Sequence, residues 1–162
     1  MTEMQFAPAI DSPMVIVTCA VGNRHEGCLV GFSTQCSIDP PRFLVCLSEA
    51  NATFQLAEEA SVLAVHLLGV QDRRIAKLFG EVTGDEADKF AATPWRMGDH
   101  GAPVLTSVSA YFEGAILDKL PLGDHVGFLL APLDPVDAAS AVVERQLLLR
   151  DAVGLRAGHE IP

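Results

Sequence analysis

The sequence predicts a mainly β fold, an antiparallel barrel or sandwich with inserted short helices and a C-terminal helix. Six short runs of apolar and β-branched residues are bounded by turn signals such as Gly-Asn and Asp-Pro-Pro. Helical patterns are inserted between some of these runs and do not alternate with them regularly, which disfavours a doubly wound parallel sheet. Neither a G-x-G-x-x-G nor a G-x-x-x-x-G-K motif follows the first run, in agreement with this fold class.

The composition is typical of one globular domain, which we place at residues 1–162. With 49% hydrophobic and 20% charged residues, the chain can bury a core. A formal net charge of −10 with scattered Lys and Arg residues offers no basic stripe for nucleic acid. The first residues lack a signal-peptide pattern, and no apolar run approaches the ~18 residues of a membrane span. We therefore expect a soluble, cytoplasmic protein that binds neither nucleic acid nor membranes.

Four predicted strands occupy the first half of the chain, at residues 14–20, 28–33, 43–48 and 62–68. The charged residues 24–26 before the second strand are expected to form a solvated hairpin tip. His66 lies within the fourth strand, where a histidine is more often a satisfied core residue than a ligand. Two later strands, 105–117 and 125–133, flank a segment with Pro, Gly and Asp, which predicts a long antiparallel hairpin.

Helical periodicity appears in three segments. Residues 52–60 and 71–80 are short, and in the second of them Ile75, Leu78 and Phe79 share one face. Residues 136–154 form a longer candidate within a tail of 135–162, with Asp134 or Asp137 as its cap and Gly154 at its end. We expect this C-terminal helix to pack on the barrel or on a dimer partner, because its apolar residues exceed one narrow face.

The four cysteines do not indicate a metal site. Their spacings contain no C-x-x-C pair and no neighbouring histidine pattern of the zinc type. Cys19, Cys28 and Cys46 lie in apolar runs and are expected to be small buried hydrophobic residues. Cys36 lies in a polar segment, for which the sequence gives no clear role.

Two polar clusters flank the third strand. The second cluster, S-E-A-N-A-T at residues 48–53, ends a strand and opens a helix. Oriented hydroxyls and backbone N–H groups can hold a phosphate at such a point without bulk positive charge. Ser48, Asn51 and Thr53 could therefore converge on an anion. The alternative is helix capping alone, with Asn51 as the N-cap residue.

The first cluster, G-F-S-T-Q-C-S at residues 31–37, offers neutral donors and acceptors near a glycine. The hydroxyls of Ser33, Thr34 and Ser37 and the amide of Gln35 suit a heteroaromatic ring with alternating carbonyls and ring nitrogens. The alternative is a polar turn that leads into the Asp-Pro-Pro sequence.

The order of several motifs resembles the flavin reductase-like, FMN-binding split-barrel family. These motifs are GCLVGFSTQCSIDPPRFLVCLSEANAT, LAVHLL, RRIAKLFG, DKF, GAPVL and GDHVGFLL, and together they span roughly residues 10 to 135. The resemblance implies a Greek-key split β-barrel that forms a homodimer, with one flavin near each subunit interface. It also implies that the ring is lined by Phe32, Ser33, Thr34, Gln35, Cys36 and Ser37, and the phosphate held by Ser48, Asn51 and Thr53.

Three further residues acquire candidate roles from this resemblance. His125, in the G-D-H motif, would be the catalytic residue that supports charge on the reduced ring or contacts the nicotinamide; alternatively it is simply bonded to Asp124 or to backbone. Lys89, in D-K-F, could approach the phosphate or be a surface lysine. Trp95 either shields the flavin or packs in the fold.

The implied activity is hydride transfer from NADH or NADPH to FMN or FAD, with reduced flavin supplied to a partner monooxygenase. The alternatives are a flavoprotein that retains FMN as an electron carrier and a binding module whose flavin site has decayed. Leu29, Gly31 and Gln35 depart from the family pattern and leave fewer hydroxyls facing the ring. Glu113 stands where the family usually has cysteine, a change that bears on flavin affinity more than on the fold.

Overall fold

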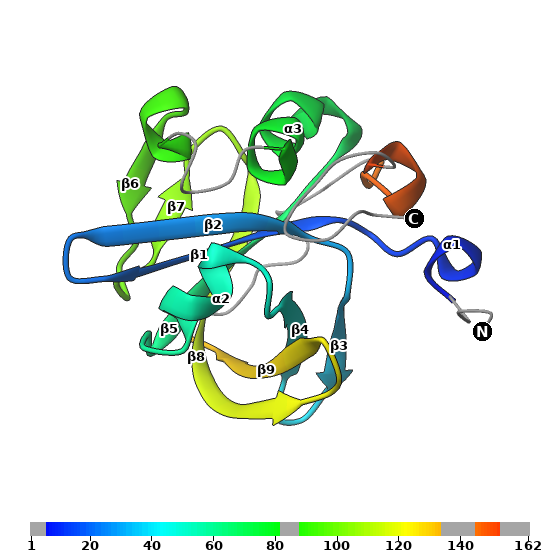
Figure 1. Ribbon diagram of the computed structural model, residues 1–162, viewed down its shortest axis with the longest axis horizontal. Helices are drawn as coiled ribbons and strands as arrows, with labels where there is room; N and C mark the ends of the chain where they lie inside the picture. Colours follow the sequence, from blue (N-terminus) through cyan, green and yellow to red (C-terminus); the bar gives the residue numbers. More distant parts are fainter. Residues whose placement is uncertain (1–5, 82–87, 134–144, 153–162) are drawn as a thin grey trace.

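A computed structural model describes residues 6–81, 88–133 and 145–152 of the chain (Figure 1). Its main feature is a curled seven-stranded antiparallel sheet in the order β2-β1-β5-β8-β9-β4-β3. A two-stranded sheet, β6-β7, stands beside it. This is the mainly β barrel architecture with short inserted helices that the sequence predicts.

The strands of the large sheet are β1 (Val15–Val21), β2 (Arg24–Val30), β3 (Ser33–Ser37), β4 (Arg42–Ser48), β5 (Val62–Leu67), β8 (Ala110–Pro121) and β9 (His125–Pro132). The small sheet contains β6 (Trp95–Met97) and β7 (Pro103–Leu105). The helices are α1 (Ala7–Ile10), α2 (Ala52–Ala57) and α3 (Arg73–Glu81), with 3₁₀ turns η1 (Val70–Asp72), η2 (Lys89–Ala92) and η3 (Leu149–Ala152).

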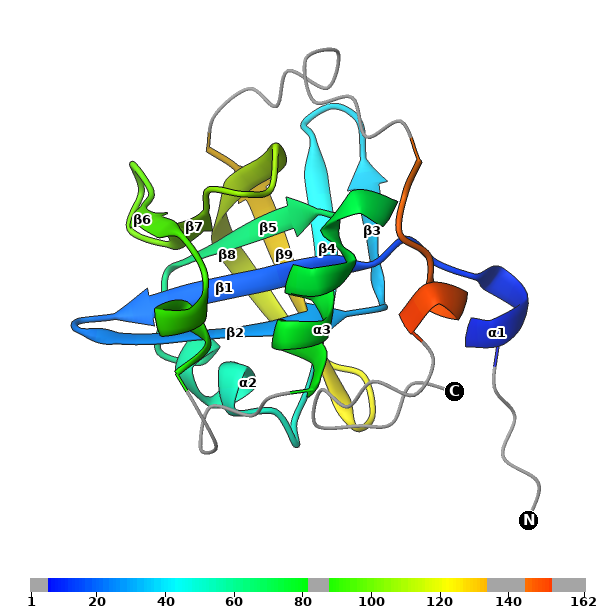
Figure 2. The same ribbon diagram turned by 90° about the horizontal axis from the view of Figure 1, so that it is seen from above.

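Two apolar cores lie on opposite faces of the β1-β2 hairpin. Val15, Val17 and Cys19 point to the inside of the curled sheet, where they meet residues of β4, β8, β9 and α2. The intervening Ile16 points outward and joins Phe79 of α3 in the second core. Since successive side chains of a strand point to opposite faces, β1 contributes side chains to both cores. Figures 1 and 2 show the result, with α2 and α3 on opposite sides of β1 and β2.

Most of the predicted elements are confirmed, and the long hairpin is β8-β9. Residues 24–26 are an exception, because they pair within β2 and the tip is the turn at Gly22 and Asn23. Gly22 has φ of 61°, which favours glycine and fixes this tight turn. The alternative of a polar turn is also wrong at residues 33–37, since they form the edge strand β3, paired on one side with β4.

The predicted C-terminal helix is wrong over residues 145–148, while 136–144 and 153–154 lie outside the described residues. Gln146 forms an isolated bridge with Gly69, and Leu148 forms one with Pro13. The Leu147 carbonyl accepts the Met14 N–H at 2.7 Å, and the Leu147 N–H donates to Leu68. Backbone pairing with two parts of the barrel therefore overrides the local helical pattern. The expected packing on the barrel is nevertheless present, because Leu147 and η3 residue Leu149 belong to the outer core.

His66 is a satisfied core residue, as expected. Its side chain is fully buried, its Nδ1 lies 3.1 Å from the Ile16 carbonyl, and its Nε2 accepts the Leu105 N–H at 2.9 Å. These two contacts fix a neutral ring with its proton on Nδ1. The ring thereby ties β5 to β1 and β7.

Glu113 of β8 has a structural role that the sequence did not reveal. Its nearly buried carboxylate accepts the backbone N–H groups of His100 and Ala102 at 3.1 to 3.2 Å. A Cβ atom at Gly98 would collide with this carboxylate and with the Ala102 carbonyl, so the close approach requires glycine there. Glu113 thus anchors the turn that joins β6 to β7.

Within the described ranges, no helix is long and apolar enough to cross a membrane. The same residues include no group of three or more His, Cys, Asp or Glu side chains placed to hold a metal ion.

Candidate functional site

The edge where β4 ends and β9 begins brings together three of the residues singled out in the sequence. Ser48 and His125 are direct cross-strand partners, and the Glu49 N–H donates to the Asp124 carbonyl at 3.0 Å. Phe32, in the corner between β2 and β3, joins them because its carbonyl accepts the Cys46 N–H at 2.9 Å. The Phe32 and His125 ring centroids lie 5.1 Å apart. We refer to Phe32, Ser48, Asn51, Asp124 and His125 as the candidate site.

His125 is oriented by its neighbour in the chain. Its Nδ1 lies 2.7 Å from the Asp124 Oδ1, so the predicted contact with Asp124 is present. The His125 side chain remains 20% exposed, and Phe32 beside it is 42% exposed. The contact with Asp124 therefore does not bury the imidazole, and a ligand can reach both rings.

The turn between β4 and α2 is held by its own polar side chains. The Asn51 Oδ1 accepts the Thr53 N–H at 3.0 Å, which confirms that Asn51 is the N-cap of α2. The Ser48 Oγ accepts the Ala50 N–H at 3.2 Å. Both side chains are largely buried. These bonds fix the shape of the turn beside His125.

Thr53 and Lys89 do not lie on the surface of the candidate site. Thr53 is fully buried on the inner side of α2, and its carbonyl is 4.0 Å from the Cys19 Sγ. Lys89 is not a surface lysine, since it is 6% exposed and its Nζ donates to the carbonyls of Gly27 and Phe79 at 2.8 and 3.3 Å. Its ammonium group therefore ties η2 to β2 and α3.

The predicted ring-lining residues of β3 differ in exposure. Thr34, Gln35 and Cys36 are exposed, and Ser33 and Ser37 are half-buried. The Thr34 hydroxyl donates to the Gln35 carbonyl at 3.0 Å, and the Gln35 amide donates to the Ser37 carbonyl at 3.1 Å. The strand thus presents a polar edge next to Phe32, with a bulge between Gln35 and Ser37.

Two of the cysteines are unsuited to nucleophilic chemistry. Burial raises the pKa of the Cys19 thiol to about 12. Burial also raises the pKa of the Cys28 thiol to about 11, against a smaller opposing effect of the Thr53 hydroxyl. Both cysteines are buried as expected, whereas Cys46 is half-buried and Cys36 is exposed.

The aromatic pair of Phe32 and His125 was not apparent from the sequence as a pair. The two residues are separated by most of the chain, and only the β4-β9 register brings them together. Trp95 packs against His25 and Phe90, with ring centroids 4.8 and 5.5 Å apart.

The chain is similar to several flavin reductases. A probable flavin reductase from Rhizobium meliloti is 32% identical over 68% of this chain and 36% of that protein. An FMN reductase (NADH) RutF from Bradyrhizobium diazoefficiens is 35% identical over 57% of this chain and 52% of that protein. The reductase subunit HsaB of a flavin-dependent monooxygenase from Mycobacterium tuberculosis is 27% identical over 76% of this chain and 66% of that protein. The chain spans about a third to two thirds of the length of these relatives.

A solved crystal structure has a similar fold to this chain. The crystal structure of an FMN-binding protein from Thermus thermophilus superposes with a TM-score of 0.76 at 25% identity, covering 83% of this chain and 75% of that one. A family model described as the flavin reductase like domain matches residues 8–144, which include every residue of the candidate site. The chain therefore belongs to the flavin reductase-like domain family.

Proposed function

We propose that the protein is an NAD(P)H-dependent flavin reductase that transfers hydride from NADH or NADPH to FMN or FAD. The observation that carries this proposal is the meeting of Phe32, Ser48 and His125 at one accessible edge of the barrel. Family membership supports it, as do relatives named as flavin reductases. No protein nucleophile is needed for this reaction, because the cofactors carry the chemistry.

The residues at this edge fit a flavin. Phe32 provides an accessible aromatic face, and the side chains of β3 provide neutral donors and acceptors beside it. The strand-to-helix turn at Ser48 and Asn51 would face the phosphate end. Bound there, the flavin supplies the hydride acceptor; the chain supplies orientation and electrostatic support.

His125 is the residue we assign to electrostatic support. Asp124 holds its Nδ1 and so fixes the ring beside Phe32. With Nδ1 donating to Asp124, the ring can donate from Nε2 to developing negative charge when both of its nitrogens carry a proton, or it can contact the nicotinamide. In this assignment Asp124 is a positioning residue and His125 the catalytic one.

The test is oxidation of NADH and NADPH by purified protein, with and without added FMN or FAD. We expect turnover that depends on added flavin. His125→Gln should lower it at least about tenfold, less than the 10²–10³ typical of a buried donor because His125 is partly exposed. His100→Gln is the matched control, since His100 is an exposed histidine in the β6-β7 turn. Equal turnover of the His125 variant and the wild type would remove His125 from the mechanism, and no turnover with any flavin would refute the reductase.

Retention of FMN as an electron carrier is the second candidate. The structural similarity to an FMN-binding protein favours it. It predicts that FMN copurifies with the protein and is not released on dilution. If the protein instead uses flavin as a substrate, we expect it to purify without colour and to release flavin readily on dilution.

We also propose an oxygenase as the recipient of the reduced flavin and the cytoplasm as the site of action. The similarity to a monooxygenase reductase subunit supports the first of these. The net charge of −10 and the absence of a membrane-spanning helix among the described residues are compatible with the second.

A homodimer is the assembly that we propose. The outward face of β4, β8 and β9 carries a leucine patch, which we define as Leu44, Leu120, Leu122 and Leu129. Leu44 and Leu122 close over Gly127, where an added Cβ would lie about 3 Å from both side chains. By strand alternation this face also contains Ser48 and His125. A second copy that covers the patch would therefore lie beside the candidate site.

Replacing two of these leucines should separate the subunits. Leu120→Asp/Leu122→Asp places charges on the patch, where desolvating them would oppose association. We expect sedimentation equilibrium to give dimer mass for the wild type and monomer mass for the variant. Leu133→Asp is the control, because Leu133 is as exposed as Leu120 but lies outside the patch. A wild type that is monomeric at micromolar concentration would contradict the proposal.

A further inference from the structure

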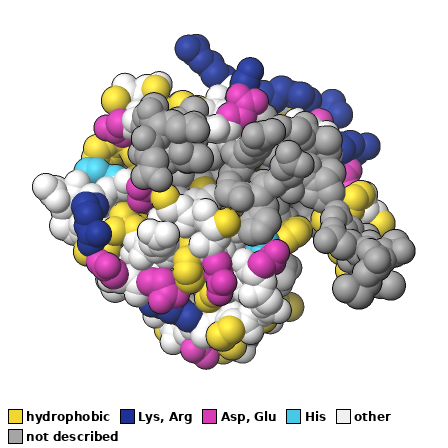
Figure 3. Space-filling model, viewed as in Figure 1, with side chains coloured by type: hydrophobic (Ala, Val, Ile, Leu, Met, Phe, Trp, Pro, Cys, Tyr) yellow, Lys and Arg dark blue, Asp and Glu magenta, His cyan; other side chains and the backbone are white. Residues whose placement is uncertain are grey.

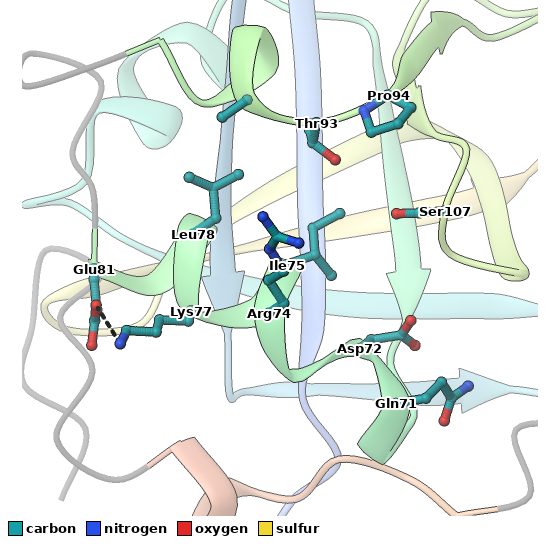
Figure 4. A pocket seen from close by; sticks show the side chains of 11 residues that line it. Gln71, Asp72, Arg74, Ile75, Lys77, Leu78, Glu81, Thr93, Pro94 and Ser107 are labelled. Carbon is teal, nitrogen blue, oxygen red and sulfur yellow. Dashed lines mark ion pairs between the residues drawn. The ribbon is translucent and has the colours of Figure 1, made fainter.

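A groove lies between α3 and the segment from η2 into β6 (Figure 4). Its volume is about 710 Å³, within the range of small-molecule sites. One wall is α3, with Arg74, Ile75 and Leu78; the other carries Thr93, Pro94 and Ser107. We call it the α3 groove. None of the residues of the candidate site lines it.

Two acidic and two basic residues line the groove, and they differ in what their side chains contact. Asp72 is largely buried and its Oδ2 accepts the Gly69 N–H at 2.8 Å. Lys77 faces Glu81 at 3.9 Å. Arg74 has no ion pair or hydrogen bond within the part of the chain that the structure describes. Arg74 is therefore the charge that an incoming anion would meet.

The direction of Arg74 agrees with this role. Figure 4 shows its guanidinium group extending into the groove toward Leu78 and Thr93, while Lys77 turns away toward Glu81. Figure 3 shows Lys and Arg side chains gathered along the edge of the molecule above α3, although the net charge of the chain is −10. An anion that approaches this edge would thus meet several Lys and Arg side chains, although the protein is acidic overall.

We propose that the α3 groove binds a small organic anion, a carboxylate or phosphate attached to an apolar body. A guanidinium group matches the two oxygens of either anion through paired hydrogen bonds. The hydroxyls of Thr93 and Ser107 stand on the facing wall as further donors. Ile75, Leu78 and Pro94 provide apolar contact for the body of the ligand. This site is separate from the proposed flavin site and needs no flavin.

The only tryptophan of the chain gives a direct readout. Trp95 follows Pro94 of the groove wall and is half-buried against Phe90. We would titrate the protein with benzoate, phenyl phosphate and the uncharged benzamide while recording tryptophan fluorescence. We expect saturable change with at least one anion and at least about tenfold weaker binding of benzamide, since the charge-assisted hydrogen bonds are lost. The anion that binds more tightly identifies the carboxylate or the phosphate as the preferred group.

Two variants make the test specific to Arg74. Arg74→Gln should weaken binding of the preferred anion about tenfold. Arg73→Gln is the matched control, because Arg73 is also an exposed arginine of α3 but is paired with Asp151 at 3.3 Å and does not line the groove. Binding of benzamide as tight as that of the anions, equal weakening by both variants, or no saturable change with either anion would each overturn the proposal. Flavin-dependent turnover in the same preparation is measured separately, so the two proposals fail independently.

Discussion

Between pH 7 and pH 5 the wild-type protein should lose about 2 kcal/mol of its free energy of unfolding through His66 alone. The His66→Gln variant should lack this part of the pH dependence. The glutamine side chain would still carry a donor and an acceptor for the Ile16 carbonyl and the Leu105 N–H. Glutamine cannot take up a proton, however. The variant therefore removes the titration of residue 66 while it keeps the possible hydrogen bonds.

The physical cause is the burial of the imidazole. Burial lowers the pKa of His66 from 6.5 to about 4, and the hydrogen bond to Ile16 opposes this only in part. The folded ring therefore stays neutral at pH values where the unfolded chain takes up a proton. The stabilisation is fully present above the unfolded pKa of 6.5 and is lost as the pH falls toward 4.

Chemical unfolding of both proteins at several pH values between 7 and 5 measures the effect. Above pH 7 the variant should be the less stable protein, because glutamine does not reproduce the fit of the ring. Its stability should then change less than that of the wild type as the pH falls. His100→Gln, which removes an exposed histidine, should keep the wild-type profile. Parallel profiles for the wild type and His66→Gln would show that folding does not lower the pKa of His66, and would contradict this prediction.

The local pattern of the sequence predicts the elements whose surroundings agree with it. The run at β1 is apolar on both faces because the two cores cover it, and the β-branched residues of β1 and β5 suit a strand. Prediction failed at residues 145–148, where a helical pattern of leucines is drawn into extended pairing with Met14 and Leu68. That pairing depends on distant chain segments, so the local hydrophobic periodicity of residues 145–148 does not indicate it.

The candidate site is predictable in part for the same reason. Ser48 and Asn51 belong to one strand-to-helix turn, and Asn51 has the local signature of an N-cap. The contact of His125 with Asp124 is also local. The pairing of Phe32 with His125 arises from the register of the sheet, and the burial of Lys89 arises from the packing of α3. Neither can be predicted from the spacing of residues in the sequence.

Removal of the Glu113 carboxylate should have the second large effect. Glu113→Ala should lower the free energy of unfolding by about 3 kcal/mol, because hydrogen bonds to a charged acceptor contribute about 1.5–3 kcal/mol each and the Ala102 N–H would lose its partner in a buried position. The free energy of unfolding of Glu113→Gln should lie between those of the wild type and Glu113→Ala. Its amide keeps one acceptor oxygen but presents an N–H group to a backbone N–H.

Unfolding in urea at pH 7 measures this loss, and hydrogen exchange shows where it occurs. We expect the amides of His100 and Ala102 to exchange faster in Glu113→Ala, since both donate to the carboxylate in the wild type. Asp118→Ala is a matched control on the same strand, because Asp118 is exposed and accepts only the N–H of its neighbour Lys119 among the described contacts. Its cost should stay below about 1 kcal/mol. If Glu113→Ala were as stable as Asp118→Ala, the β6-β7 turn would be held by its own backbone bonds, and the glutamate would have to be explained by the ligand chemistry of the barrel instead.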